Sequence, residues 1–277
     1  EAGMRIVDTH VHRGVSRNAR SLHAFLGVSA LLFIVSAAMT IRVCTSMSSM
    51  HEMPMPGGWT MSMTWMRMPG QTWTDASAAF LGMWLAMMVA MMLPSLLPML
   101  WRYRQSMGGA DETHLALVTA LVGVAYFFVW TVFGAAIFAS GIALTKITLQ
   151  SPAFAHAVPL VVGLVVVVAG ALQFSAWKAR HLACCRAAMT CPCTETADIG
   201  KAWRHGLRLG VHCCECCIGP TTILLVMGVM DLRAMAAVTA AITIERFAPA
   251  AERSARGIGI LVVALGLTLI ARSLLTA

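Results

Sequence analysis

Long apolar runs, bounded by short polar segments, dominate the pattern of hydrophobic and polar positions along the chain. An apolar run of about 20 residues is long enough for a helix to cross the hydrocarbon core of a membrane. Acidic and basic side chains cluster between these runs. The pattern therefore predicts an all-α fold, a polytopic transmembrane helical bundle of about seven spans. We expect the spans at residues 22–41, 77–100, 115–145, 157–177, 205–230, 234–247 and 257–275.

The composition agrees, with 58% hydrophobic and only 12% charged residues. Arg and Lys are frequent in the N-terminal segment and in the loops after the second, fourth and sixth spans, and rarer in the others. Because Arg and Lys accumulate on the cytoplasmic side, this alternation predicts a cytoplasmic N-terminus and an external C-terminus in a bacterial inner (plasma) membrane. The net charge of +8 is then explained by basic residues that contact anionic lipid headgroups beside the spans. Nucleic acid is not an expected partner, because a basic stripe with stacking aromatic residues is missing.

The predicted spans divide the chain into four parts. Residues 1–21 are interpreted as a basic cytoplasmic tail, and residues 22–41 as a first span that remains as an uncleaved anchor. Residues 42–76 form an external loop rich in Met and His. Residues 77–277 form a six-span membrane core, which contains a Cys/His-rich segment at 181–217.

The external loop carries many soft ligand atoms. Thioethers favour Cu(I) and need no deprotonation, and they persist in an oxidising compartment where free thiols would pair. The alternative is that the methionines are adaptable apolar filler, but eight of them in a polar loop favour copper binding. The candidate ligands of the loop are Met47, Met50, His51, Met53, Met55, Met61, Met63, Met66 and Met68.

A second group of soft ligands lies on the predicted cytoplasmic side. Eight of the nine cysteines fall within residues 184–217, which indicates metal binding more than the alternative of inert buried thiols. Disulfides are not expected in the reducing cytosol, whereas transient thiol exchange by the Cys-x-x-Cys pairs stays open. The candidate ligands are His181, Cys184, Cys185, Cys191, Cys193, His212, Cys213, Cys214, Cys216 and Cys217.

Helical geometry predicts which of these side chains face one another. Successive residues of a helix turn by about 100°. A single arc, roughly 140° wide, then holds His212, Cys213, Cys216 and Cys217. Cys214 borders this arc and Glu215 points away from it. Three thiols and an imidazole on one face suit Cu(I), Zn(II) or an iron–sulfur cluster.

The second predicted span carries two stripes of methionine. Met83, Met87 and Met91 lie on one stripe, and Met88, Met92 and Met99 on its neighbour. Such a ladder could relay Cu(I) through the bilayer without charged side chains, although methionine at helical spacing is also an ordinary packing surface. Glu215 and Glu245 are further functional candidates, because ionisable groups in a membrane are costly.

Three motifs resemble those of a known family. "AMMLPSLLPM" (90–99), "GLRLGVHCCECC" (206–217) and "ERFAP" (245–249) are similar, in order and spacing, to signatures of a bacterial family of predicted metal-binding integral membrane proteins. The resemblance covers roughly residues 75–275 and implies that Cys213, Cys216 and Cys217 bind metal. The family pattern has a thiol where this chain has His181, which leaves the identity of the metal open.

The sequence therefore predicts a copper-handling membrane protein that captures, relays or delivers Cu(I), possibly as accessory subunit of a copper-dependent membrane enzyme. Copper is the expected metal, with zinc or an iron–sulfur cluster as alternatives. Expected partners are the lipid bilayer, the metal ion, and other membrane subunits or a metallochaperone. Nucleotide-binding and hydrolytic motifs are missing, which argues against an enzyme. A redox subunit, or a structural subunit with packing Met and Cys, is the alternative function.

Overall fold

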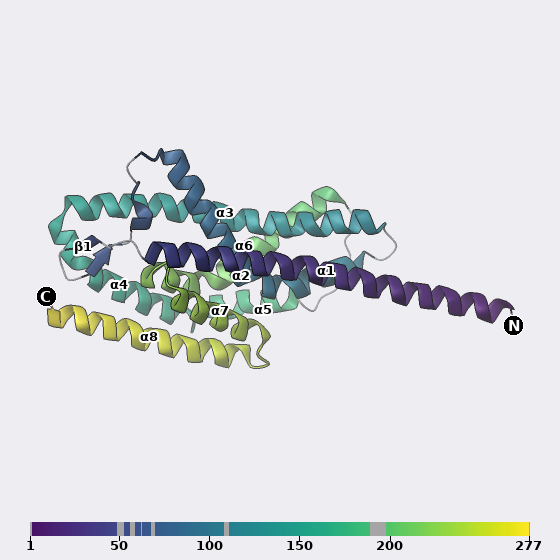
Figure 1. Cartoon of the computed structure of the whole chain (residues 1–277). Coiled ribbons are helices and arrows are strands. Elements are labelled where there is room, and N and C mark those ends of the chain that lie inside the picture. Colours follow the sequence, from purple (N-terminus) through teal and green to yellow (C-terminus); the bar gives the residue numbers. More distant parts are fainter. Residues whose placement is uncertain are drawn as a thin grey trace.

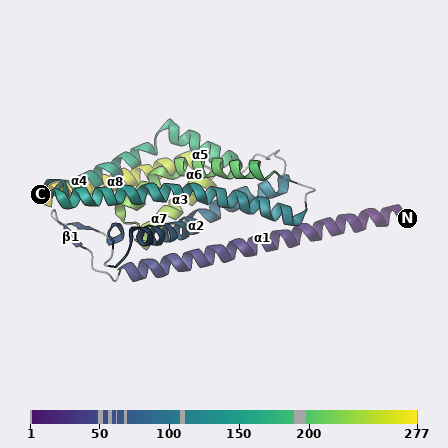
Figure 2. The ribbon, with the colours of Figure 1, turned by 90° about the horizontal axis from the view of Figure 1, so that it is seen from above.

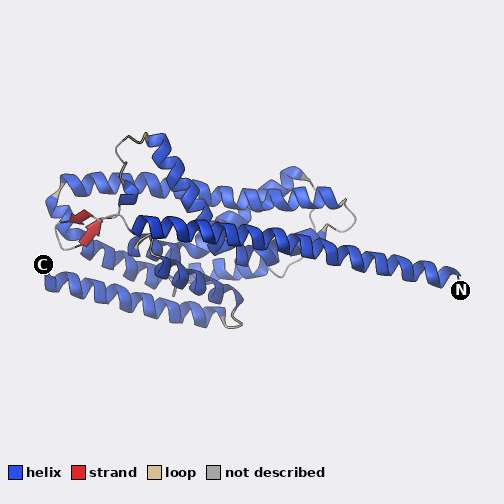
Figure 3. Ribbon diagram, in the orientation of Figure 1, coloured by secondary structure: helices blue, strands red, loops and turns tan. Residues whose placement is uncertain are grey.

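The structure is a computed structural model that describes residues 2–48, 53–55, 59–61, 63–67, 70–107, 111–188 and 198–276. This part of the chain forms a helical bundle with one small hairpin (Figures 1 and 3). The helices are α1 (Ala2–Ser48), α2 (Trp73–Ser106), α3 (Glu112–Gln150), α4 (Pro152–Leu172), α5 (Ala176–Ala188), α6 (Ile199–Met227), α7 (Leu232–Phe247) and α8 (Ala251–Thr276). The hairpin consists of β1 (Met53–Met55) and β2 (Trp59–Met61), and a 3-10 turn, η1 (Met63–Trp65), follows it. The predicted all-α class is confirmed.

Six of the described helices are long and apolar enough to cross a membrane. They cover Ser21–Ser46, Trp73–Ser106, Glu112–Gln150, Pro152–Leu172, Ile199–Met227 and Ala251–Leu275. The span expected at 234–247 corresponds to α7, which has 16 residues and is therefore only about 24 Å long. Asp231 caps its start and Ala248 its end, so α7 is the shortest of the seven helices that correspond to the expected spans.

The span expected at 157–177 is also interrupted. Helix α4 ends at Leu172, and α5 begins at Ala176 after a short turn. The hydroxyl of Ser175 donates to the Leu172 carbonyl at 2.6 Å and accepts from the Lys178 backbone N–H at 3.1 Å. This turn satisfies backbone groups at the break, so that the chain can change direction next to apolar neighbours.

Helix α6 lies at the centre of the bundle, where it packs against α3, α4, α5 and α7. Helix α2 has the largest buried share of the six candidate spans, and its interior face includes Trp84, whose indole N–H donates to the Trp130 carbonyl at 2.9 Å. Helix α1 contacts α2 along one side, and its N-terminal half projects beyond the other helices (Figure 2). The two termini lie at opposite ends of the molecule (Figure 1).

Tryptophans hold the loop between α1 and α2 against the bundle. The Trp59 indole N–H donates to the Ala155 carbonyl of α4 at 3.0 Å. The ring of Trp65 lies 5.4 Å from that of Phe80 in α2 and covers Gly141 of α3. Because β1 and β2 pair antiparallel with Met53 opposite Met61, these two methionines lie side by side in a hairpin that is attached to the start of α4.

Two glycines allow α6 to approach α3 closely. A Cβ atom at Gly206 would lie 2.4 Å from the Val122 carbonyl oxygen, and one at Gly210 would lie 3.0 Å from the Tyr126 carbonyl oxygen. Both glycines are one helical turn apart on the same face, as in other close helix pairs of membrane proteins. The close approach of the two helices places Cys213 of α6 beside Tyr126 of α3.

We expect Gly206→Ala to destabilise the protein, because the new methyl group meets backbone that cannot rotate away and α3 must separate from α6. The loss in unfolding free energy should be about 1–3 kcal/mol, measured by thermal unfolding in detergent micelles. The control is Gly200→Ala on the same helix, where the nearest atom would be 3.6 Å away and helix propensity favours alanine by about 1 kcal/mol. Equal melting temperatures for both variants would contradict this account of the interface.

Candidate metal centre

The thiols of α6 face the interior of the bundle. Cys213, Cys216 and Cys217 are each at most 2% exposed, whereas Cys214 is only partly buried. This agrees with the helical spacing, which predicted these three thiols on one face and Cys214 at its border. A buried position excludes water, so a metal ion here would be held by protein ligands alone.

Four buried thiols form a continuous chain of contacts. Cys185, from α5, contacts Cys216; Cys216 contacts Cys217; and Cys217 contacts Cys213, each through their sulfur atoms. The Cys213 thiol also lies 4.0 Å from the Met92 thioether of α2. We call Cys185, Cys213, Cys216 and Cys217 the thiol chain. It brings soft ligands from α5 and α6 together, next to one from α2.

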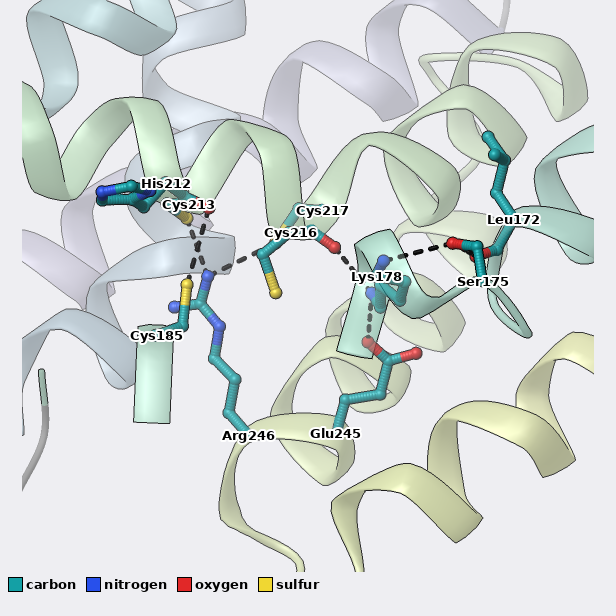
Figure 4. A network of polar contacts seen from close by, with 10 residues as sticks. All are labelled: Leu172, Ser175, Lys178, Cys185, His212, Cys213, Cys216, Cys217, Glu245 and Arg246. Carbon is teal, nitrogen blue, oxygen red and sulfur yellow. Dashed lines mark hydrogen bonds and ion pairs between the residues drawn. The ribbon is translucent and has the colours of Figure 1, made fainter. Parts of the chain in front are cut away.

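A buried arginine lies against this chain. Arg246 of α7 is 3% exposed, and its guanidinium donates to the sulfur of Cys213 at 2.8 Å and to that of Cys217 at 3.3 Å (Figure 4). The same guanidinium donates to the Ser95 hydroxyl of α2 at 2.7 Å. The Tyr126 hydroxyl donates to the Cys213 sulfur at 2.8 Å. Cys213 thus receives two hydrogen bonds, which fix the position of its sulfur between α3 and α7.

An ion pair supports the other side of the centre. The Lys178 ammonium lies 2.7 Å from the Glu245 carboxylate and donates to the Cys216 carbonyl at 2.6 Å (Figure 4). Both side chains of the pair are at most 5% exposed. Burial alone lowers the pKa of Lys178, but the Cys216 sulfur and the Glu245 carboxylate outweigh it and raise the pKa above its ordinary value. The ammonium therefore stays charged and fixes the backbone of α6 at Cys216.

Helix α7 supplies both charges of this network from consecutive positions. Glu245 pairs with Lys178, and Arg246 meets the sulfurs. The Arg186 guanidinium of α5 donates to the Arg246 and Ala248 carbonyls, at 2.9 and 2.7 Å, and so satisfies the end of α7. The pair Lys178–Glu245 is neutral as a whole, which leaves Arg246 as a positive charge whose described partners are a hydroxyl and two sulfurs.

Sequence reasoning missed the role of Arg246 and of Lys178, because both counted as loop charges that set topology. The structure buries them, so neither is a loop charge. The signal lay in "ERFAP", where an adjacent acid and base occur beside apolar runs. Glu245 was expected to be functional because of its cost in a membrane, and it does lie in the network. Tyr126 and Ser95 carried no signal of their own, whereas Met92 belongs to one of the two methionine stripes that the sequence indicated.

The predicted histidines lie apart from the thiol chain. His212 belongs to the same helical arc as the thiols but is at its edge, and its side chain is 48% exposed. It points with Glu215 toward His181 of α5. Cys184 is exposed on α5, and Cys191 and Cys193 lie outside the described residues.

The methionines of the loop are only partly within the described residues. Met53 and Met55 are half-buried in β1, Met61 is buried, and Met66 is half-buried. Met50, His51 and Met68 lie outside the described part of the chain; Met47 and Met63 fall within α1 and η1, and their side chains are not described.

A pocket of about 440 Å³ joins the loop to the bundle. Its lining includes Met39 of α1, Met66 of the loop, Met83 of α2 and Met230 of the turn before α7. The methionines of α2 continue from this pocket into the core; the buried ones are Met83, Met87, Met88, Met91, Met92 and Met99. Soft thioethers therefore occupy one buried helix between the pocket and the thiol chain.

The comparisons with known proteins agree with this chemistry. The family model of PpoB2, described as a copper chaperone, matches residues 81–269. No curated protein and no solved structure matches the chain significantly. The matched segment contains α3 to α7 entirely, and with them the thiol chain, Arg246 and the Lys178–Glu245 pair. The chain belongs to the PpoB2 family of copper chaperones.

Proposed function

We propose that this protein receives Cu(I) at the methionine-rich loop of residues 42–76 and holds it on the thiol chain. It then delivers the ion, as an accessory subunit, to a copper-dependent membrane enzyme. The observation that carries the proposal is the thiol chain buried against the Arg246 guanidinium. Membership in a copper chaperone family supports copper as the metal. Thiolate and thioether sulfur are the ligands that Cu(I) prefers.

The charges of the centre favour Cu(I) over divalent ions. Cu(I) bound by two thiolates carries a single negative charge, which the guanidinium of Arg246 compensates at contact distance. An unpaired charge in the apolar interior costs several kcal/mol. Zn(II) with four thiolates would carry twice that negative charge, and Arg246 would compensate only half of it. A Cu(I) dithiolate therefore leaves the neutral centre that this environment requires.

The methionines of α2 offer a route to this centre. Met83 lines the pocket beneath the loop, and Met92 lies 4.0 Å from the Cys213 sulfur. These two residues are separated by about 14 Å along the helix, and the intervening buried methionines supply neutral, soft ligands. A monovalent ion can pass between such ligands without a change in protonation, since thioethers do not ionise.

We infer an orientation with the N-terminus in the cytoplasm, the C-terminus and the loop at 42–76 outside, and the bacterial plasma membrane as location. The opposite positions of the two termini support this orientation (Figure 1). The loop then faces the compartment where thioethers outlast thiols. The receiving partner is a membrane enzyme subunit or a metallochaperone, and we propose no catalytic reaction for the chain itself.

Replacing single thiols tests the centre. We expect Cys213→Ser and Cys217→Ser to weaken Cu(I) binding by more than about 100-fold, because losing a ligand costs more than the 10–100-fold typical of outer-shell changes. Cys214→Ser and Cys184→Ser are the controls, since both thiols lie outside the thiol chain. The measurement is anaerobic competition with a chromophoric Cu(I) chelator. Equal losses in all four variants would contradict binding at the thiol chain.

The identity of the metal has its own test. Protein purified anaerobically from native membranes, without added metal, should contain stoichiometric copper by elemental analysis. Zinc or iron in place of copper would overturn the proposal, and so would a metal-free protein with intact fold.

Removing the charge of Arg246 tests the electrostatic argument. We expect Arg246→Met to keep the sulfur ligands but to weaken Cu(I) binding by about 10–100-fold, because the dithiolate loses its counter-charge. Arg233→Met, on the exposed face of the same helix, is the matched control and should bind as the unchanged protein does. If Arg246→Met binds Cu(I) with full affinity, the guanidinium has no role in charge compensation.

A further inference from the structure

The side chains of His181, His212 and Glu215 lie close together, beside the face of α6 that carries the buried thiols. The Glu215 carboxylate oxygen Oε2 lies 2.9 Å from Nδ1 of His181 and 3.2 Å from Nδ1 of His212. The ligand atoms of these three residues all lie within 4.8 Å of one another. Among the described residues, these three side chains are therefore close enough together to bind one metal ion.

The packing of two helices fixes this arrangement. His212 and Glu215 are three residues apart on α6 and therefore share one side of it. His181 reaches them from α5, and the ring of Trp177, one turn earlier, lies 4.5 Å from its imidazole. The rings of His181 and His212 are 6.2 Å apart between centroids and tilted by 44°, so both present Nδ1 to the same carboxylate without stacking.

Hydrogen bonding alone does not account for the geometry. Nδ1 of His181 is buried, yet it makes no hydrogen bond among the described residues, although the Glu215 oxygen is 2.9 Å away. A buried polar atom without a hydrogen bond costs about 1–3 kcal/mol. Two imidazole nitrogens directed at one carboxylate oxygen are instead the donor arrangement of a metal site.

The donor atoms select a different ion from that of the thiol chain. Two imidazoles and one carboxylate are the ligands of borderline divalent ions such as Zn(II), commonly with an open fourth position. The side chains are 21 to 48% exposed, so that water can reach that position, whereas the neighbouring thiols are buried. Because the two ligand sets share no donor atom, they would be occupied independently.

We propose that His181, His212 and Glu215 form a second metal site, which binds a borderline divalent cation of the Zn(II) type. The site lies one residue from the thiol chain in sequence but uses no sulfur. It does not rest on the copper function, because its ligands and its preferred ion are different.

Anaerobic titration of the full-length protein in detergent with Co(II), a spectroscopic substitute for Zn(II), tests the site. We expect the protein to bind one equivalent of Co(II) at this site, with ligand-field bands but without thiolate-to-cobalt charge-transfer bands. Added Zn(II) should displace this Co(II). Glu215→Ala and His181→Ala should each lower the affinity for Co(II) by more than about 100-fold. His156→Ala, an exposed histidine on α4, is the control and should leave it unchanged.

The Cu(I) stoichiometry and the melting temperature of each variant separate loss of the site from loss of the fold. Unchanged copper binding together with lost cobalt binding supports the second site. Co(II) that binds with thiolate charge-transfer bands, fails to bind the unchanged protein, or binds Glu215→Ala and His181→Ala normally would overturn it and leave a simple histidine–carboxylate ion pair.

Discussion

The energetic cost of a charge in an apolar bundle is the constraint on which this structure depends. Helix α7 brings an acid and a base, Glu245 and Arg246, into the interior at adjacent positions. Glu245 has its partner in Lys178 from α5. Arg246 has no carboxylate partner among the described residues, and its guanidinium is directed at two sulfurs. The interior therefore favours an anion at the sulfurs, and in the proposed function a Cu(I) dithiolate would be that anion.

The short length of α7 is part of the same arrangement. A helix of 16 residues is about 24 Å long, shorter than a hydrocarbon core of about 30 Å, and its end lies against α5. The carbonyl groups freed at that end are satisfied by Arg186, as the freed groups at the break between α4 and α5 are satisfied by Ser175. Both breaks adjoin the thiol chain. Irregular backbone inside a membrane protein is tolerated only where protein buries it, and here the two breaks place Lys178 and Arg246 beside the thiol chain.

Helix α6 separates two kinds of ligand chemistry. One side carries buried sulfur from Cys213, Cys216 and Cys217, enclosed by α2, α3 and α5. The other edge carries the imidazole and carboxylate of His212 and Glu215, which are reached by solvent. Soft and borderline ions differ in the donors that they prefer, so one helix can present two sites without competition between them. The methionines of α2 extend only the soft side, toward the pocket under the loop.

The sequence by itself determined the helical class, the positions of six spans and the face on which three thiols lie, because hydrophobic period and residue type act locally. It also indicated soft-metal chemistry, since so many cysteines and methionines are hard to explain by packing. Only the tertiary structure decided that Arg246 and Lys178 are buried at the thiols, that Met92 adjoins Cys213, and that His181 of α5 reaches Glu215. These contacts join residues as far as 121 positions apart. They depend on how α2, α5, α6 and α7 pack, and a local pattern does not specify such packing. The end of α7 depends on the same packing, because Arg186 of α5 donates to the carbonyl groups that are left free there.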